Sequence, residues 1–311
     1  MKKVTVIGAG NVGATVANVL AHKDLVNEIV ILDIMGDFAR GKALDTWQQA
    51  PIDFYSTRVK GTDNYADTAD SDIVVITAGL PRKPGMSRDD LIATNAKIVN
   101  SVVRSILEYS KEPIIIVVSN PLDVMTYAAH LTSGMPRNKV FGMAGILDTA
   151  RFTAFIAEEL NVSPKDIHTL LLGGHGDTMV PLPRYTTVAG IPLRELMDET
   201  TITRLVERAK VGGGELVKLM GTSAWYAPGA AAAQMVESIL KDDGRIFPCC
   251  VKLEGEFGFE DVYLGVPVQL GENGIRRIIE INLNEGEVAL LKDSATAVKS
   301  VMDAYDSLDK V

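Results

Sequence analysis

Short apolar runs alternate with amphipathic stretches over the first half of the chain. Runs rich in valine and isoleucine occur at residues 4–7, 29–32, 73–77 and 114–118, which is typical of parallel strands covered on both faces. Residues 14–21 and 95–109 have helical spacing, and residues 140–142 fit a last short strand. Strands that alternate with helices up to about residue 143 predict a Rossmann-type, doubly wound parallel sheet.

The pattern changes after residue 143. Helices are expected over residues 148–160, 202–220, 229–241 and 285–302, and strands over residues 168–172 and 180–188. Two further strands, at residues 263–270 and 275–281, flank a Gly-Glu-Asn-Gly segment that predicts a hairpin. We therefore expect an α/β domain over residues 1–143, followed by an α+β domain with antiparallel strands over residues 144–311.

Composition narrows the class of protein. The 311 residues are 47% hydrophobic and 23% charged, as in ordinary globular proteins, and the net charge is −9. An acidic chain argues against nucleic acid or a membrane surface as partner, and no apolar run approaches the roughly 18 residues of a membrane helix. The two cysteines, Cys249 and Cys250, are adjacent, which suits neither a disulfide nor a metal site. We expect a small-molecule partner, no bound metal and a reducing, cytoplasmic location.

A glycine-rich turn follows the first strand. The segment GAGNVG consists of Gly8, Ala9, Gly10, Asn11, Val12 and Gly13, and it opens the first helix. Glycines in this pattern allow a tight turn and let the backbone approach a pyrophosphate at the helix N-terminus. Asp33 ends the second strand, where its carboxylate would bind the ribose diol and repel a 2′-phosphate. This motif predicts an NAD site, and a turn without ligand is the alternative.

Two more segments leave the carboxyl edge of the predicted sheet, where doubly wound folds bind ligands. The segment at residues 77–88 contains Arg82, Lys83 and Arg88 with several Gly and Pro residues, so it suits a lid that receives an anion. Ser119 and Asn120 end the fourth apolar run, and Asn120 could donate to a substrate oxygen. A solvated basic loop is the alternative for the first segment, and a simple Asn-Pro turn explains the second equally well.

A histidine and an Asp-Arg pair are the candidates for chemistry. His175 lies among glycines directly after an apolar run, so its imidazole should be accessible. Asp148 and Arg151 share one face of a predicted helix, where such a pair is usually a surface ion pair. If the three met in space, His175 could transfer a proton, Asp148 could stabilise its charged form, and Arg151 could clamp a carboxylate. The other three histidines have ordinary helix or strand contexts.

Nearly the whole chain resembles the lactate and malate dehydrogenase family. The resemblance rests on GAGNVG, Asp33, AGLPRKPGMSR, SNP, LDTAR and GGHGD, in that order. It implies that His175 accepts the proton in alcohol oxidation with Asp148 as its partner, and that Arg151 anchors the substrate carboxylate. It further implies that Arg88 polarises the carbonyl, that Asn120 contacts substrate and cofactor, and that Asn95, Val118 and Ser119 belong to the NAD site.

The resemblance places Arg82 at the loop position that separates the two activities of this family. Lactate dehydrogenases usually carry glutamine at the corresponding loop position, whereas a second arginine suits the second carboxylate of malate or oxaloacetate. We therefore expect an NAD-dependent malate dehydrogenase, with L-lactate dehydrogenase as the alternative. NAD-dependent glycoside hydrolysis, which usually needs a metal held by Cys and His, and a non-catalytic protein of the same fold are more distant alternatives.

The resemblance also implies a homodimer or a homotetramer. The predicted helix at residues 202–220 has an apolar face that could form such an interface. Packing in the core explains the same pattern equally well.

Overall fold

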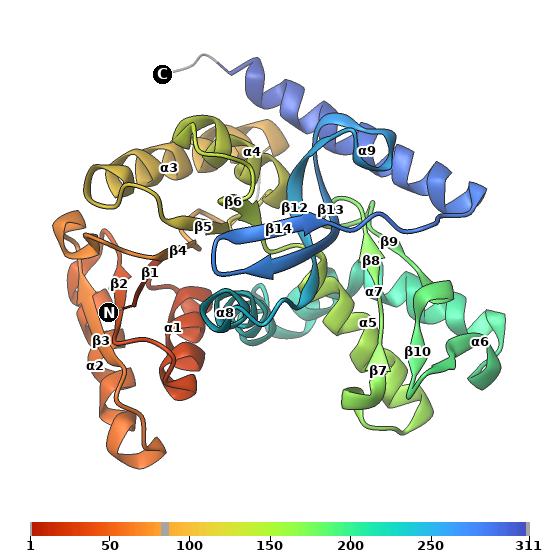
Figure 1. Ribbon diagram of the computed structural model, residues 1–311, viewed down its shortest axis with the longest axis horizontal. Helices are drawn as coiled ribbons and strands as arrows, with labels where there is room; N and C mark the ends of the chain where they lie inside the picture. Colours follow the sequence, from red (N-terminus) through yellow and green to blue (C-terminus); the bar gives the residue numbers. More distant parts are fainter. Residues whose placement is uncertain (1, 82–86, 309–311) are drawn as a thin grey trace.

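The computed structural model describes residues 2–81 and 87–308 (Figure 1). Its main sheet has nine strands. The strand order is β14-β13-β12-β6-β5-β4-β1-β2-β3. The six strands of the first half run parallel: β1 (Lys3–Ile7), β2 (Glu28–Leu32), β3 (Arg58–Thr62), β4 (Ile73–Ile76), β5 (Ile114–Val117) and β6 (Val140–Gly142). The chain winds outward from β1 in both directions, which confirms the predicted doubly wound fold.

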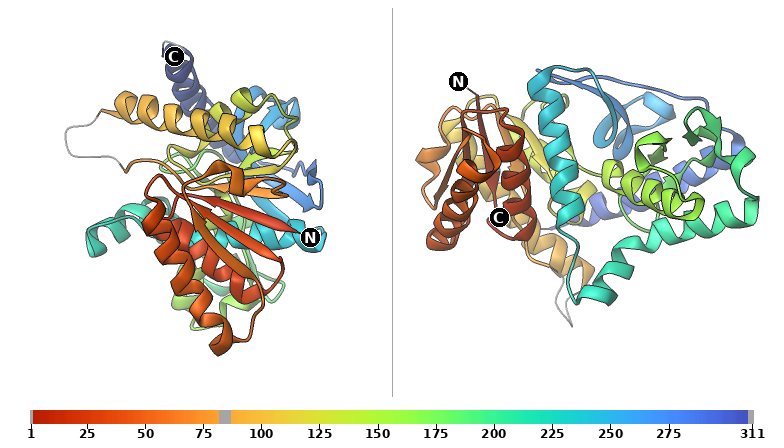
Figure 2. Two further views of the ribbon diagram at one scale, coloured as in Figure 1. Left: turned by 90° about the vertical axis from the view of Figure 1, so that its left-hand side faces the viewer. Right: turned by 90° about the horizontal axis from the view of Figure 1, so that it is seen from below.

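Helices cover both faces of the parallel strands (Figure 2). Helices α1 (Asn11–Lys23) and α2 (Gly36–Asp53) pack together on one face, and α3 (Arg88–Tyr109) and α4 (Leu122–Ser133) pack together on the other. Every residue of β4 and β5 is buried, which explains their unbroken apolar sequences. Strand β3 was not predicted because it lies at the edge of the sheet and alternates exposed with less exposed residues.

Strands from the second half continue the same sheet. Strand β12 (Ile246–Glu254) pairs antiparallel with β6, where Cys250 lies opposite Gly142. Strands β13 (Glu260–Gly271) and β14 (Gly274–Ile278) form the predicted hairpin beyond it. Strand β12 was not predicted, because it contains Pro248, a residue that is unfavourable inside strands. The antiparallel α+β character predicted for the second half is confirmed.

The remaining strands are short and lie outside the main sheet. Strands β7 (Ile167–His168), β10 (Thr187–Val188) and β11 (Ile191–Pro192) form one small sheet, and β8 (Leu171–Leu172) and β9 (Val180–Pro181) form another. The two strands expected at residues 168–172 and 180–188 are thus each broken in two. In the second of these, Pro183 starts a 3-10 turn that interrupts the extended backbone.

Over residues 144–308 the structure has five helices: α5 (Gly145–Leu160), α6 (Leu193–Leu196), α7 (Glu199–Met220), α8 (Tyr226–Lys241) and α9 (Glu285–Asp306). The 3-10 turns are η1 (Tyr65–Thr68), η2 (Pro164–Asp166), η3 (Pro183–Tyr185) and η4 (Glu256–Gly258). Helix α8 packs on α1 and helix α9 packs on α3 and α4, so elements of the second half cover both faces of the parallel sheet (Figures 1 and 2). None of the described helices is long and apolar enough to cross a membrane.

Candidate active site

The glycine turn joins β1 to α1 and has room for a ligand. A Cβ at Gly13 would lie 1.9 Å from the carbonyl oxygen of Gly8, so only glycine allows the helix to start this close to the strand. Ala9 N–H donates to Asp33 Oδ2 at 2.7 Å, which fixes the carboxylate beside the turn. Met35 N–H donates to Asp33 Oδ1 at 2.9 Å. The turn and the predicted ribose-binding carboxylate are therefore one connected unit.

The N-terminus of α1 fits the pyrophosphate of a dinucleotide. Within the part of the chain that the structure describes, no side chain caps this end at Gly10, and the first turn has no acidic residue. Gly10 is exposed, and nothing lies within 4 Å of a Cβ placed there. The free N–H groups and the helix dipole therefore attract an anion without competition from a carboxylate of the same turn.

Asn95 connects two loops at the carboxyl edge of the sheet. It is 1% exposed; its amide nitrogen donates to the carbonyl oxygens of Leu80 and Asn120, and its Oδ1 accepts from Leu80 N–H. Ser119, also buried, donates to the carbonyl oxygen of Ala78 at 2.6 Å. Val118 is buried, whereas Asn120 is exposed. Asn95 and Ser119 thus fix the loop backbone at the predicted NAD site, next to the exposed Asn120.

Asp148 binds both His175 and Arg151. Its Oδ2 lies 2.8 Å from His175 Nδ1, and its Oδ1 accepts from Arg151 Nη1 at 3.1 Å. The side chain of Asp148 is 2% exposed, and the side chains of His175 and Arg151 are 19% and 14% exposed. The structure therefore brings together the three candidate residues, whose proximity the sequence could not show. The Asp148-Arg151 pair is buried and does not form a surface ion pair.

The environment of His175 favours the imidazolium. Burial lowers the pKa of this histidine, but the charge and hydrogen bond of Asp148 raise it, and the net result is a pKa above the ordinary value. With Nδ1 bound to Asp148, Nε2 is the nitrogen that can exchange a proton with a ligand. Arg151 Nε is buried and has no partner among the described residues, so this guanidinium retains unused donors.

The backbone of the His175 loop is held by three contacts. Gly173 and Gly265 exchange hydrogen bonds of 2.9 and 3.0 Å, and a Cβ at Gly265 would come within 2.5 Å of the Gly173 carbonyl oxygen. Gly174 N–H donates to Ser294 Oγ of α9 at 2.8 Å. His175 N–H donates to Asp123 Oδ2 at 3.0 Å.

Sequence reasoning missed Ser294 and Asp123, which lie far from His175 along the chain. The local signal for Asp123 was an acidic residue two positions after the Ser119-Asn120-Pro121 segment. A second missed signal is the glycine triplet inside α7, because a Cβ at Gly212 would lie 3.3 Å from Arg151 Cδ. This part of α7 therefore lies against the arginine side chain.

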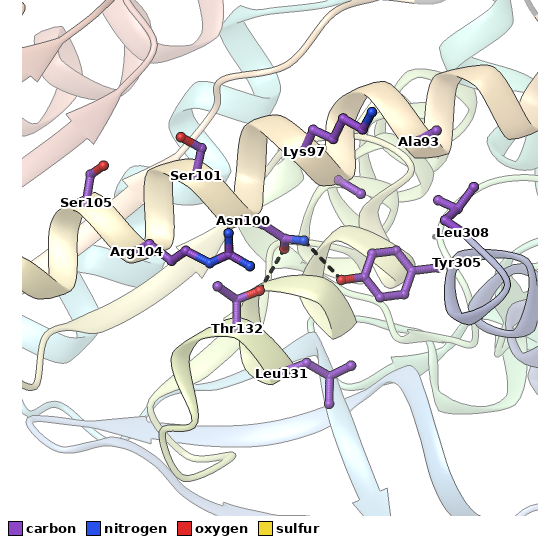
Figure 3. A pocket seen from close by; sticks show the side chains of 11 residues that line it. Ala93, Lys97, Asn100, Ser101, Arg104, Ser105, Leu131, Thr132, Tyr305 and Leu308 are labelled. Carbon is purple, nitrogen blue, oxygen red and sulfur yellow. Dashed lines mark hydrogen bonds between the residues drawn. The ribbon is translucent and has the colours of Figure 1, made fainter. Parts of the chain in front are cut away.

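A cavity of about 500 Å³ lies over His175. Asn120, Asp123, His175 and Val298 are among its lining residues, and its volume is in the range of small-molecule sites. A larger cavity of about 830 Å³ lies between α3, α4 and α9 (Figure 3). There Asn100 donates to the Tyr305 hydroxyl and accepts from Thr132. None of the predicted site residues lines the larger cavity, so the larger volume does not mark the candidate active site.

Two predicted substrate residues cannot be placed in full. Arg82 lies outside the described residues, and Arg88 is described only as the first backbone position of α3. Among the other histidines, His22 contacts Asp53, His130 contacts the Tyr263 hydroxyl, and His168 is exposed in β7. Cys249 and Cys250 are buried and not bridged. Over residues 2–81 and 87–308 no cluster of three or more His, Cys, Asp or Glu side chains could hold a metal ion.

A dinucleotide-type turn on a doubly wound sheet, with a buried acid-histidine pair and an arginine beside it, defines an NAD-dependent oxidoreductase. The family model of the lactate/malate dehydrogenase NAD binding domain matches residues 2–142, and that of the lactate/malate dehydrogenase alpha/beta C-terminal domain matches residues 146–308. The chain belongs to the lactate/malate dehydrogenase family.

Relatives in this family match almost the full chain. A malate dehydrogenase of Cytophaga hutchinsonii is 64% identical over 98% of both chains, and one of Salinibacter ruber is 58% identical over 98% of both. The solved structure of malate dehydrogenase from Salinibacter ruber aligns with a TM-score of 0.95 at 56% identity and covers 98% of both chains.

Replacing Asp148 with asparagine should lower the pKa of His175 by about one unit or more, because the substitution removes the charge that stabilises the imidazolium. A raised pKa in the folded state stabilises the protein below the unfolded-state pKa, and this stabilisation is lost as pH rises through the folded-state pKa. The contribution of His175 to the pH dependence of stability should therefore be smaller in Asp148→Asn. An NMR titration of the histidine rings measures the shift, with exposed His168 as internal control. Equal His175 titrations in both proteins would contradict the electrostatic account.

Proposed function

We propose that the chain is an NAD-dependent malate dehydrogenase that interconverts (S)-malate and oxaloacetate. The observation that carries the proposal is the Asp148 carboxylate, which binds His175 and Arg151 beside the carboxyl edge of a sheet with a dinucleotide turn. NAD, when bound, accepts the hydride from the alcohol carbon. The close relatives named malate dehydrogenase support this choice over lactate dehydrogenase.

His175 carries the proton in this proposal. During alcohol oxidation its Nε2 accepts the hydroxyl proton, and during reduction the imidazolium returns a proton to the carbonyl oxygen. Asp148 fixes the tautomer through Nδ1 and stabilises the imidazolium. The raised pKa of His175 suits the reduction direction, which needs the protonated ring.

The substrate carboxylates are assigned to arginines. Arg151 clamps the carboxylate next to the reacting carbon, which its buried and unused Nε supports. Arg88 polarises the carbonyl, Asn120 donates to the substrate, and Arg82 pairs with the distal carboxylate. Pyruvate carries a methyl group in place of that distal carboxylate and would leave the Arg82 charge unpaired in a closed site.

The cofactor is expected to be NAD and not NADP. Asp33 holds its carboxylate beside the glycine turn, where it would accept from the ribose hydroxyls and repel a 2′-phosphate. We also propose that the cofactor domain ends at residue 143 and the catalytic domain begins at residue 144, next to the end of β6. The buried, unbridged cysteines agree with a reducing location, which we propose to be the cytoplasm.

A homo-oligomer, either a dimer or a tetramer, is the proposed assembly. Large apolar side chains are exposed along α2 at Leu44 and Ile52, and along the C-terminal half of α7 at Val217 and Leu219. The N-terminal half of α7 buries its apolar residues, so its pattern reflects both core packing and an unpartnered face. Exposed apolar patches of this kind mark association surfaces.

Light scattering should therefore give at least a dimer mass for the wild type. Leu219→Glu should reduce the mass, because a charge on a 75% exposed apolar position opposes burial in an interface. Leu290→Glu, at a 52% exposed position on α9, is the control. A monomeric wild type would exclude the oligomer.

His175→Asn should lower kcat for oxaloacetate reduction by about a hundredfold to ten-thousandfold, because it removes proton transfer. NADH affinity should change little, because the glycine turn and Asp33 are untouched. Steady-state kinetics and fluorescence titration with NADH measure the two effects. His168→Asn, at an exposed position of β7, should behave as wild type. Wild-type turnover in His175→Asn would make this histidine structural.

Arg82→Gln should lower kcat/KM for oxaloacetate and raise it for pyruvate, since it removes the charge that pyruvate leaves unpaired. The wild type should favour oxaloacetate by at least about a hundredfold. NADH oxidation with oxaloacetate, with pyruvate and without a keto acid tests the function and the variant together. Arg104→Gln, on the exposed side of α3, is a matched control. If Arg82→Gln leaves the ratio of kcat/KM for oxaloacetate and pyruvate unchanged, Arg82 does not contact the substrate.

A further inference from the structure

The cavity of about 830 Å³ between α3, α4 and α9 has a polar and positively charged lining (Figure 3). The described residues that line it include the cations Lys97 and Arg104 but no aspartate or glutamate. The chain as a whole, by contrast, carries a net charge of −9. The cavity shares no lining residue with the one over His175, and its volume is in the range of small-molecule sites.

Helix α3 forms one wall of this cavity. The helix turns the same side toward the cavity at intervals of three or four residues, namely at Ala93, Lys97, Asn100 and Arg104. Its core-facing side is apolar and fully covered, at Ile92, Val99, Val103 and Ile106. A stripe that served only to pack α3 against its neighbours would also be apolar, so the polar stripe indicates a wet or ligand-binding space.

Asn100 connects the three helices around the cavity. Its amide nitrogen donates to the Tyr305 hydroxyl of α9 at 3.1 Å, and its Oδ1 accepts from the Thr132 hydroxyl of α4 at 2.8 Å (Figure 3). The Tyr305 oxygen is therefore an acceptor in this contact, and the hydroxyl hydrogen has no acceptor within residues 2–81 and 87–308. Tyr305 is thus held in place with a donor to spare.

The Arg104 guanidinium has no acid to pair with in the part of the chain that the structure describes. Arg137 and Arg184, by comparison, each pair with a glutamate. Asp306, an acid at the end of α9, does not line the cavity and accepts instead from the Tyr127 hydroxyl at 2.9 and 3.0 Å. The positive charge of Arg104 is therefore available to an anion, and a guanidinium binds a phosphate or carboxylate through two parallel hydrogen bonds.

We propose that this cavity is a second binding site, for a small organic anion that combines a phosphate or carboxylate group with an apolar body. Arg104 and the Tyr305 hydroxyl bind the anionic group, and Lys97 adds a second positive charge. Leu131, which is 49% exposed, and Leu308 contact the apolar body. The site uses neither the glycine turn nor the residues around Asp148, so it goes beyond the proposed dehydrogenase function.

Phenyl phosphate is the probe for this site, because it joins a phosphate to an apolar ring. Calorimetric titration with and without saturating NADH and malate, which fill the proposed cofactor and substrate sites, should give the same affinity in both conditions. Inorganic phosphate lacks the ring and phenol lacks the charge, so each should bind at least about tenfold more weakly. Benzoate carries a carboxylate on the same ring, and its affinity relative to phenyl phosphate shows which anionic group the site prefers.

Two variants locate the probe. Arg104→Gln removes the unpaired charge and should weaken phenyl phosphate about tenfold or more. Tyr305→Phe keeps the ring but removes the hydroxyl, and should weaken the probe about threefold to tenfold. Arg277→Gln, at an exposed position of β14, is the matched control and should bind the probe as the wild type does. In the wild type, NMR should show that the probe shifts the ring resonances of Tyr305, a measurement that needs no variant.

Several results would overturn this second site. Phenyl phosphate and benzoate that both fail to bind at millimolar concentration are one, and unshifted Tyr305 resonances are another. Equal affinities in the wild type, Arg104→Gln and Tyr305→Phe would place the probe elsewhere, and loss of binding on addition of NADH and malate would place it in the candidate active site. A wild type that binds the probe but does not reduce oxaloacetate refutes the proposed function alone, so the two failures are distinguishable.

Discussion

A buried carboxylate must be compensated by its neighbours, and Asp148 imposes this requirement on the whole site. Its side chain is almost fully excluded from water. One carboxylate oxygen contacts Arg151 and the other contacts His175. Removing either partner would leave an incompletely compensated buried charge, which is costly. The hydrogen bonds that compensate the Asp148 charge therefore also orient the imidazole of His175 and the guanidinium of Arg151. The proposed proton carrier and the proposed carboxylate clamp thus share a single anchor, Asp148 on α5.

The position of this anchor depends on how the two halves are joined. Strand β12 lies beside β6, and Gly173 bonds to Gly265 in the next strand, β13, so the main sheet carries the His175 loop. Helix α4 comes from the first half and brings Asp123 against the same loop. The geometry of the candidate site is thus fixed by strand pairing between the two halves of the chain and not by a flexible connection.

The sequence was informative where one local pattern determines the result. Buried parallel strands such as β4 have unbroken apolar sequences, and the glycine turn has its own spacing. It was less informative where contacts join distant segments. Strand β3 is polar because it lies at an edge, β12 contains Pro248, and the contact of Asp123 with His175 has no local signature. Asp148 and His175 could be nominated from their neighbours, but only the fold brings them within bonding distance.

The unbroken sheet has a consequence for any attempt to separate the cofactor-binding half. Strand β6 is an interior strand, with β5 on one side and β12 on the other. Excision after β6 would turn it into a naked edge with unpaired amide and carbonyl groups, and Cys250 would no longer cover Gly142. The apolar surface beneath α8 and α9 would also lose its cover. A fragment of this kind would present a ready template for edge-to-edge aggregation, so the dinucleotide fold here is complete only as part of the larger sheet.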